Sequence, residues 1–216
     1  ESKMMMVVPK AVAFIPIICR NRSCSTFLSS FRITLRDATP EDIPLLKKWD
    51  EKEHLAEFGG DDDFNDWSWD FELTRDPQPE WRHQLMARLG DIPIGIVQVI
   101  DPLEEESHYW GEDCEPNLRA LDIWIGEEAY LGQGYGTEMM QLALRDYCFS
   151  VPEVMATLVD PMAYNTEAIR FYQEKCRFEP VGIRYFGPDR CLVHRLERRN
   201  WKLKAVTHQD REESKI

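Results

Sequence analysis

The chain has 216 residues, 43% of them hydrophobic and 30% charged, which is typical of one globular domain with a sizeable core. Its formal net charge of −13 argues against partners such as nucleic acid or anionic membrane and favours polycationic small molecules or basic peptides. The six cysteines form no Cys-x-x-Cys pair and the five histidines no His-Glu-x-x-His motif, so we expect reduced thiols, a cytoplasmic protein and no metal site.

The first thirty residues differ from the rest of the chain. They carry four basic side chains and one acidic one, so this stretch is positive while the remainder is strongly negative. An apolar run over 11–19 has the length of a signal peptide, but Pro16 interrupts it and no cleavage pattern follows. We therefore expect a flexible or added extension over residues 1–30, one domain over 31–198, and a charged tail over 199–216 that is helical or disordered.

Hydrophobic periodicity predicts alternating strands and helices along the domain. Thr39 and Pro40 read as the cap and first position of a helix, Gly90-Asp91 as a hairpin turn, and Asn165 as another helix cap. The short apolar run 154–159 is typical of a buried parallel strand. The predicted strands are 31–36, 83–89, 92–100, 121–125, 154–159, 178–183 and 191–196, and the predicted helices 40–49, 66–75, 138–149 and 166–176.

Two loops concentrate acidic residues. The stretch 59–63 reads as a solvated loop or as a lip that attracts amines, and 102–116 carries Tyr109 and Trp110 among its acids.

A glycine-rich loop links the strand 121–125 to the helix that follows it. Gly132, Gly134 and Gly136 stand at alternate positions, so the backbone can turn tightly and leave its N–H groups uncovered next to a helix N-terminus. The dinucleotide fingerprint does not fit, because its third glycine is missing, and the nucleoside-triphosphate loop does not fit, because no lysine follows the glycines. The loop is a phosphate cradle or a simple tight turn.

The loop resembles the acetyl-CoA loop of the GCN5-related N-acetyltransferases (GNAT), in which Arg/Gln-x-x-Gly-x-Gly/Ala is usual. Gly134 and Gly136 match, while Leu131 replaces the arginine or glutamine. A second segment of the family is matched by Asn165, Ala168, Ile169, Tyr172, Lys175 and Phe178, with Cys176-Arg177 as a departure. The resemblance covers about residues 31–198 and is strongest to aminoglycoside 6′-N-acetyltransferases. It implies an α/β class protein with the GNAT fold, a strongly twisted mixed sheet with helices on both faces.

The resemblance also implies acetyl-CoA as the cofactor and two catalytic side chains. Asp122 would bind or deprotonate the substrate ammonium, or else it is an outward-facing acid of its strand. Tyr172 would protonate the departing thiolate, or else it is a core aromatic. The implied cofactor-binding residues are Ile123, Trp124, Ile125, Gln133, Gly134, Tyr135, Gly136, Thr137 and Asn165.

The substrate implied is a small polycationic amine, most similar to an aminoglycoside. Its implied binding residues are Glu80, Gln98, Trp110, Asp160 and Asp189. Ser107 departs from the acid found in similar enzymes, which leaves open a siderophore hydroxylamine, a lysine-like or protein amine, or a catalytically silent acyl-CoA-binding module. A monomer or a homodimer is compatible with the sequence.

Overall fold

The computed structural model describes residues 32–56 and 68–201. The expected extension over 1–30, the acidic loop 59–63 and the tail beyond 201 lie outside the described residues, as does the start of the helix expected from residue 66. Residues 198–201, where the tail begins, are helical.

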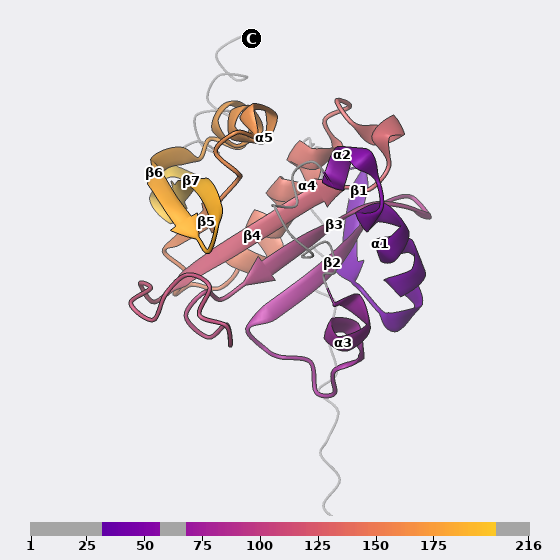
Figure 1. The fold of residues 1–216 in the computed structure, drawn as a ribbon, viewed down its shortest axis with the longest axis horizontal. Helices are drawn as coiled ribbons and strands as arrows, with labels where there is room; N and C mark the ends of the chain where they lie inside the picture. The colour runs from indigo at the N-terminus through magenta and orange to yellow at the C-terminus, as the bar shows by residue number, and fades with distance from the viewer. Residues whose placement is uncertain (1–31, 57–67, 202–216) are drawn as a thin grey trace, which may run out of the picture. The chain divides into compact units, whose positions relative to one another are not determined.

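Seven strands form one mixed sheet in the order β1-β2-β3-β4-β5-β7-β6 (Figure 1). All neighbouring pairs are antiparallel except β4 and β5, which confirms the expected parallel strand. The hairpin turn predicted at Gly90-Asp91 joins β2 to β3, with Gly90 at a φ of +60° that favours glycine. The strands are β1 (Ile33–Asp37), β2 (Arg82–Leu89), β3 (Ile92–Ile100), β4 (Leu118–Ile125), β5 (Ala156–Val159), β6 (Glu179–Phe186) and β7 (Asp189–Glu197).

The predicted helices are present, but two of them change type before they end. Phe149 N–H donates to the Leu144 carbonyl, and Cys176 N–H donates to the Phe171 carbonyl, so each ends in a wider π turn. The expected helix from Pro40 also begins as a 3-10 turn. The elements are η1 (Pro40–Asp42), α1 (Ile43–Asp50), α2 (Glu53–Ala56), α3 (Trp69–Thr74), η2 (Glu128–Tyr130), α4 (Tyr135–Ala143), η3 (Leu144–Cys148), α5 (Thr166–Arg170) and η4 (Phe171–Lys175).

The sheet carries helices on both faces, as the α/β prediction required (Figure 1). Alternate residues of β2 and β3 point to opposite faces. Met86 and Ile96 pack with Trp49 of α1 and Trp69 of α3. The other face holds a larger cluster, in which β2, β3 and β4 pack against α4 and η4.

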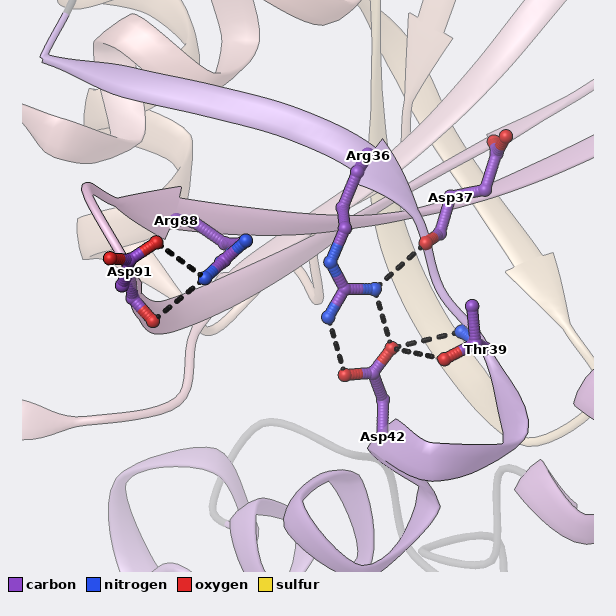
Figure 2. A network of polar contacts seen from close by, with 6 residues as sticks. All are labelled: Arg36, Asp37, Thr39, Asp42, Arg88 and Asp91. Carbon is purple, nitrogen blue, oxygen red and sulfur yellow. Dashed lines mark hydrogen bonds and ion pairs between the residues drawn. The ribbon is translucent and has the colours of Figure 1, made fainter.

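A polar network ties β1 to the start of α1 (Figure 2). Arg36 Nη1 and Nη2 each donate to one Asp42 carboxylate oxygen at 2.7 Å, and the same carboxylate accepts the Thr39 backbone N–H at 2.9 Å. Asp42 is only 8% exposed, so its charge depends on these partners. The network fixes the direction in which the chain enters the helices beside the cleft described below.

Candidate active site

The sheet opens between its two parallel strands. β4 pairs with β5 only from Leu118 to Ala120, opposite Ala156 to Leu158. Beyond Ala120, β4 has only β3 as a strand neighbour among the described residues. In Figure 1 the block formed by β5, β7 and β6 turns away from the end of β4. Ligands of open α/β sheets bind beyond the carboxyl ends of such strands.

A cavity of about 300 Å³ occupies this opening. Four aspartates line it, whereas no lysine or arginine of the described residues does. Its lining is therefore acidic, which suits a cationic ligand. Asp122 reaches it from β4, which answers the question left by the sequence: this side chain faces the cleft. The lining residues are Asp50, His54, Leu55, Tyr109, Asp122, Ile123, Trp124, Asp160, Pro161, Met162, Asn165, Ala168, Tyr172, Asp189 and Cys191.

A second cavity, of about 280 Å³, adjoins the first and shares Tyr109, Asp122 and Asp160 with it. It extends over the aromatic loop toward β2 and β3. Its only cation among the described lining residues, Arg82, is paired with Glu72. The other lining residues are Trp81, Gln98, Ile100, Glu105, Ser107, Trp110 and Ala120.

Asp122 and Asp160 stand where the two cavities meet. Both side chains are half-buried, and burial raises the pKa of each carboxyl. The negative charge of Asp160 raises the pKa of Asp122 further. Two like charges in a partly dry site favour a bound cation or a bound proton between them. The pair can therefore hold an ammonium group and accept a proton from it.

Tyr109 is the aromatic residue that the loop presents to the cavities. Its side chain stacks on Phe186, with ring centroids 4.2 Å apart and planes 5° apart, and its hydroxyl donates to Asp160 Oδ2 at 2.8 Å. Trp110, the aromatic wall expected from the sequence, is only 3% exposed and belongs to a hydrophobic cluster with Phe186. It lines the second cavity from a position that is mainly structural.

Tyr172 lies in η4 with its ring among core residues and its edge on the first cavity. Its ring is 6.0 Å from that of Phe178 and 6.4 Å from that of His194, between centroids. Among the described residues its hydroxyl has no hydrogen-bond partner. Burial, and then the charge of Asp122, raise the pKa of Tyr172 well above its usual value. The phenol therefore stays protonated and has a proton to donate.

The glycine loop leaves an open surface at the start of α4. Gly134 caps α4 at a φ of +84°, and a Cβ placed there would have only Arg32 Nη2 within 4 Å, at 3.8 Å. The loop surface is therefore open beside the helix N-terminus.

Asn165 caps α5, as predicted, by accepting the Ala168 N–H at 3.0 Å. Of the β4 residues expected to bind cofactor, Ile123 and Trp124 line the first cavity, while Ile125 is 9% exposed and packs in the core.

The other expected substrate residues are divided between the cavities. Asp189 lines the first and Gln98 the second, whereas Glu80 is exposed and lines neither.

The sequence did not predict that Asp50 lines the first cavity and Glu105 the second. Burial raises the pKa of Glu105, but hydrogen bonds from Tyr109 and Ser107 outweigh it and lower that pKa. Ser107, the unexpected serine of the loop, thus holds an acid two residues before it.

Two negative findings concern only residues 32–56 and 68–201. No helix there is long and apolar enough to cross a bilayer. No group of three or more acidic, histidine or cysteine side chains there is arranged to hold a metal ion.

Acetyltransferases are among the known proteins that are similar to this chain in sequence and in structure. The profile of the family described as "Acetyltransferase (GNAT) domain" matches residues 38–186. An aminoglycoside N(6′)-acetyltransferase type 1 of Klebsiella pneumoniae is 30% identical over 174 residues, which cover 79% of this chain and 85% of that protein. A kanamycin resistance protein of Rhizobium radiobacter is 35% identical over 97 residues, or 45% of this chain and 87% of that protein.

Solved structures of the aminoglycoside acetyltransferase AAC(6′)-Ib share the fold. Its complex with coenzyme A and kanamycin has a TM-score of 0.66 at 27% identity and covers 79% of this chain and 97% of that one. Its complex with ribostamycin and coenzyme A has a TM-score of 0.67 at 28% identity and covers 79% and 96%. The splayed sheet, the glycine loop and the family match together show that this chain belongs to the GNAT acetyltransferases.

Proposed function

We propose that this protein transfers the acetyl group of acetyl-CoA to a primary amine of an aminoglycoside-like polycation, at the 6′ position. The observation that carries the proposal is the acidic cavity: Asp50, Asp122, Asp160 and Asp189 converge beside the open edge of β4, with no cation of the described residues among them. Aminoglycosides carry several ammonium groups on a compact frame, so they match both this charge and the size of the two adjoining cavities.

Each catalytic requirement of the reaction has a residue of this chain. Acetyl-CoA supplies the activated acyl group. Asp122 and Asp160 hold the amine as its ammonium, and Asp122 accepts a proton so that the nitrogen lone pair becomes free. Beyond Ala120, the backbone N–H groups of β4 that do not bond to β3 are available to polarise a carbonyl, because the strand has lost β5 as a neighbour. As the amine nitrogen bonds to the acetyl carbon and the carbon–sulfur bond breaks, Tyr172 donates its proton to the departing sulfur, and the proton that the nitrogen then loses replaces it.

The loop from Gln133 to Thr137, at the start of α4, would hold the diphosphate of the cofactor with its backbone N–H groups. The absence of side chains at Gly134 and Gly136 supports this role. The relatives whose structures contain coenzyme A share this fold.

A panel of acceptors tests the assignment. Purified protein with acetyl-CoA is offered kanamycin, an aminoglycoside with a hydroxyl at the 6′ position, a hydroxylamine of the siderophore type, and lysine-like diamines, and free thiol is measured. We expect turnover with the 6′-amine and none with the matched 6′-hydroxyl compound. Turnover confined to hydroxylamines or to lysine-like amines would replace the aminoglycoside, and CoA binding without turnover on any amine would identify a silent acyl-CoA module.

A further inference from the structure

The proposed diphosphate loop contains no positively charged side chain that could attract a diphosphate. Between Gly126 and Glu138 the sequence contains three glutamates and no lysine or arginine, and Leu131 is 46% exposed. Glu138 stands in the first turn of α4, where its negative charge opposes the helix dipole's attraction for an anion. Backbone N–H groups alone would have to overcome this repulsion.

Strand topology brings an arginine to this loop from another part of the chain. Ile33 at the start of β1 pairs with Leu89, the end of β2. The remaining antiparallel pairings place that end of β1 at the edge of the sheet where β4 finishes. Arg32, directly before β1, therefore lies beside a loop that follows it by one hundred residues.

Side-chain contacts hold Arg32 against the loop. Its backbone N–H donates to Glu138 Oε2 at 2.8 Å, and its Nε and Nη2 donate to Glu138 Oε1 at 2.8 and 2.6 Å. Nη2 also donates to the Gln133 carbonyl at 3.2 Å, and the guanidinium lies 4.4 Å from the centre of the Tyr135 ring. Nη1 has no partner among the described residues, and half of the side chain is exposed.

We propose that Arg32 binds the diphosphate of acetyl-CoA. It neutralises Glu138, and Nη1 faces the ligand as a charge-assisted donor, so that the residue before β1 replaces the cation that the loop lacks. Glu138 and Gln133 fix the guanidinium in place, so little rotamer entropy is lost when the ligand binds. This assignment rests on the proposed function only in taking the loop as the diphosphate site, and it is independent of the acceptor amine.

Calorimetric titration of CoA into Arg32→Gln, without any acceptor, tests the assignment. We expect affinity to fall about tenfold, the scale of one lost charge-assisted hydrogen bond, and Arg32→Lys to keep part of it. Arg145→Gln is the matched control, because Arg145 is 53% exposed and is paired with Asp146. It lies about 15 Å from the glycine loop, along the helical segment formed by α4 and η3. This variant should bind CoA within about twofold of the unmodified protein.

Truncated ligands then locate the contact. The loss in Arg32→Gln should persist with dephospho-CoA, which keeps the diphosphate, and vanish with pantetheine, which has no phosphate; competition titrations serve for the weak ligands. Unchanged CoA affinity in Arg32→Gln, an equal loss with pantetheine, or a loss that disappears with dephospho-CoA would each overturn the assignment. Failure of the aminoglycoside proposal would instead show as intact CoA binding without turnover of aminoglycosides that carry a 6′-amine.

Discussion

Asp122 must be ionised to bind an ammonium group, but its surroundings in the free protein disfavour the ionised form. Its carboxyl faces a cavity whose lining includes three more aspartates, and burial together with Asp160 raises its pKa to about 7, while that of Asp160 rises to about 6. An ionised Asp122 lowers the stability of the free protein, but it stabilises a bound ammonium group. Function and stability should therefore respond to pH in opposite directions.

The stability effect has a definite sign. A carboxyl whose folded-state pKa is raised makes the native protein bind more protons than the unfolded chain, so stability falls as pH rises from about 4 to about 7. Asp122→Asn removes this group. We expect its melting temperature to exceed that of the unmodified protein at pH 8 and the difference to shrink toward pH 5. Melting curves recorded at both values check this, and a lower melting temperature at pH 8 would contradict it.

Catalysis should show the reverse dependence. The pair must be ionised to bind an ammonium group and accept its proton, so kcat/KM for the amine should rise with pH and level off above about 7. Initial rates across pH 5 to 8 at saturating acetyl-CoA measure it. A profile that is flat through this range would remove Asp122 and Asp160 as the ionising groups.

Tyr172 offers a second test at the level of one side chain. Replacing it with phenylalanine keeps the ring contacts with Phe178 and His194 and removes only the hydroxyl at the cavity. We expect kcat to fall about a hundredfold with little change in KM, because proton donation to the leaving thiolate is needed after binding. Full activity of Tyr172→Phe would leave this residue a core aromatic and assign the proton to water.

At the scale of elements, the junction of β4, its glycine loop and α4 sets the cofactor geometry. Gly134→Val adds a β-branched side chain at a φ of +84°, which costs about 1–2 kcal/mol and covers the loop surface. We expect CoA affinity to fall at least about tenfold while the fold survives. Gly90→Val introduces similar backbone strain at a φ of +60° in the β2–β3 turn and should leave CoA affinity unchanged. Equal effects of the two variants on CoA binding would contradict a specific role of the loop.

The network of Arg36 and Asp42 acts on stability instead of cofactor binding (Figure 2). Asp42→Asn breaks a partly buried ion pair and should lower the free energy of unfolding by about 2 kcal/mol. Burial raises the Asp42 pKa, but hydrogen bonds from Arg36 and Thr39 outweigh it and lower that pKa, so this contribution is lost as pH falls through it. Urea unfolding at pH 7 and calorimetry with CoA separate the two properties. If Asp42→Asn lost CoA affinity while its stability stayed unchanged, the structural role assigned to this network would be contradicted.

Periodicity placed the seven strands and the helices α1, α3, α4 and α5, because alternation and helical spacing reflect which face is buried, but the short α2 and η2 were not predicted. It could not reveal the π turns after Ala143 and Arg170, since one residue more per turn leaves the apolar pattern nearly unchanged. Asp50 was missed because it joins the first cavity from α1, a segment far from β4 in sequence, and Glu105 was missed because it is one of several acids in the loop before β4. Tyr109 is 47% exposed and lines both cavities, whereas Trp110 is 3% exposed and lines only the second, a difference that two adjacent aromatics in a loop do not disclose.

At the scale of the molecule, the buried clusters of the described residues are built from side chains between Ile33 and Trp201. A chain that begins at Phe31 should therefore melt cooperatively and bind CoA, and it retains Arg32. Differential scanning calorimetry and CoA titration of that shortened chain test the expectation. Loss of either property would make the first thirty residues part of the domain.

The net charge of −13 should also be visible in the kinetics. An acidic surface draws a polycationic acceptor toward the cavities, and salt at physiological strength limits this attraction to about 8 Å. We expect kcat/KM for kanamycin to fall between low and physiological salt, whereas a monoamine acceptor should be less affected. Equal salt dependence for the two acceptors would mean that the surface charge does not steer the substrate.

The most direct measurement compares kcat/KM for kanamycin in the unmodified protein, in Asp122→Asn and in Asp91→Asn, with CoA affinity measured alongside. Asp91 is a fully exposed acid of the β2–β3 turn and controls for the loss of one negative charge. We expect Asp122→Asn to lower kcat/KM by a factor of about a hundred or more with CoA affinity unchanged, and Asp91→Asn to leave both unchanged. Kanamycin acetylation at the normal rate by Asp122→Asn would contradict the assignment of the acidic cavity as the amine site.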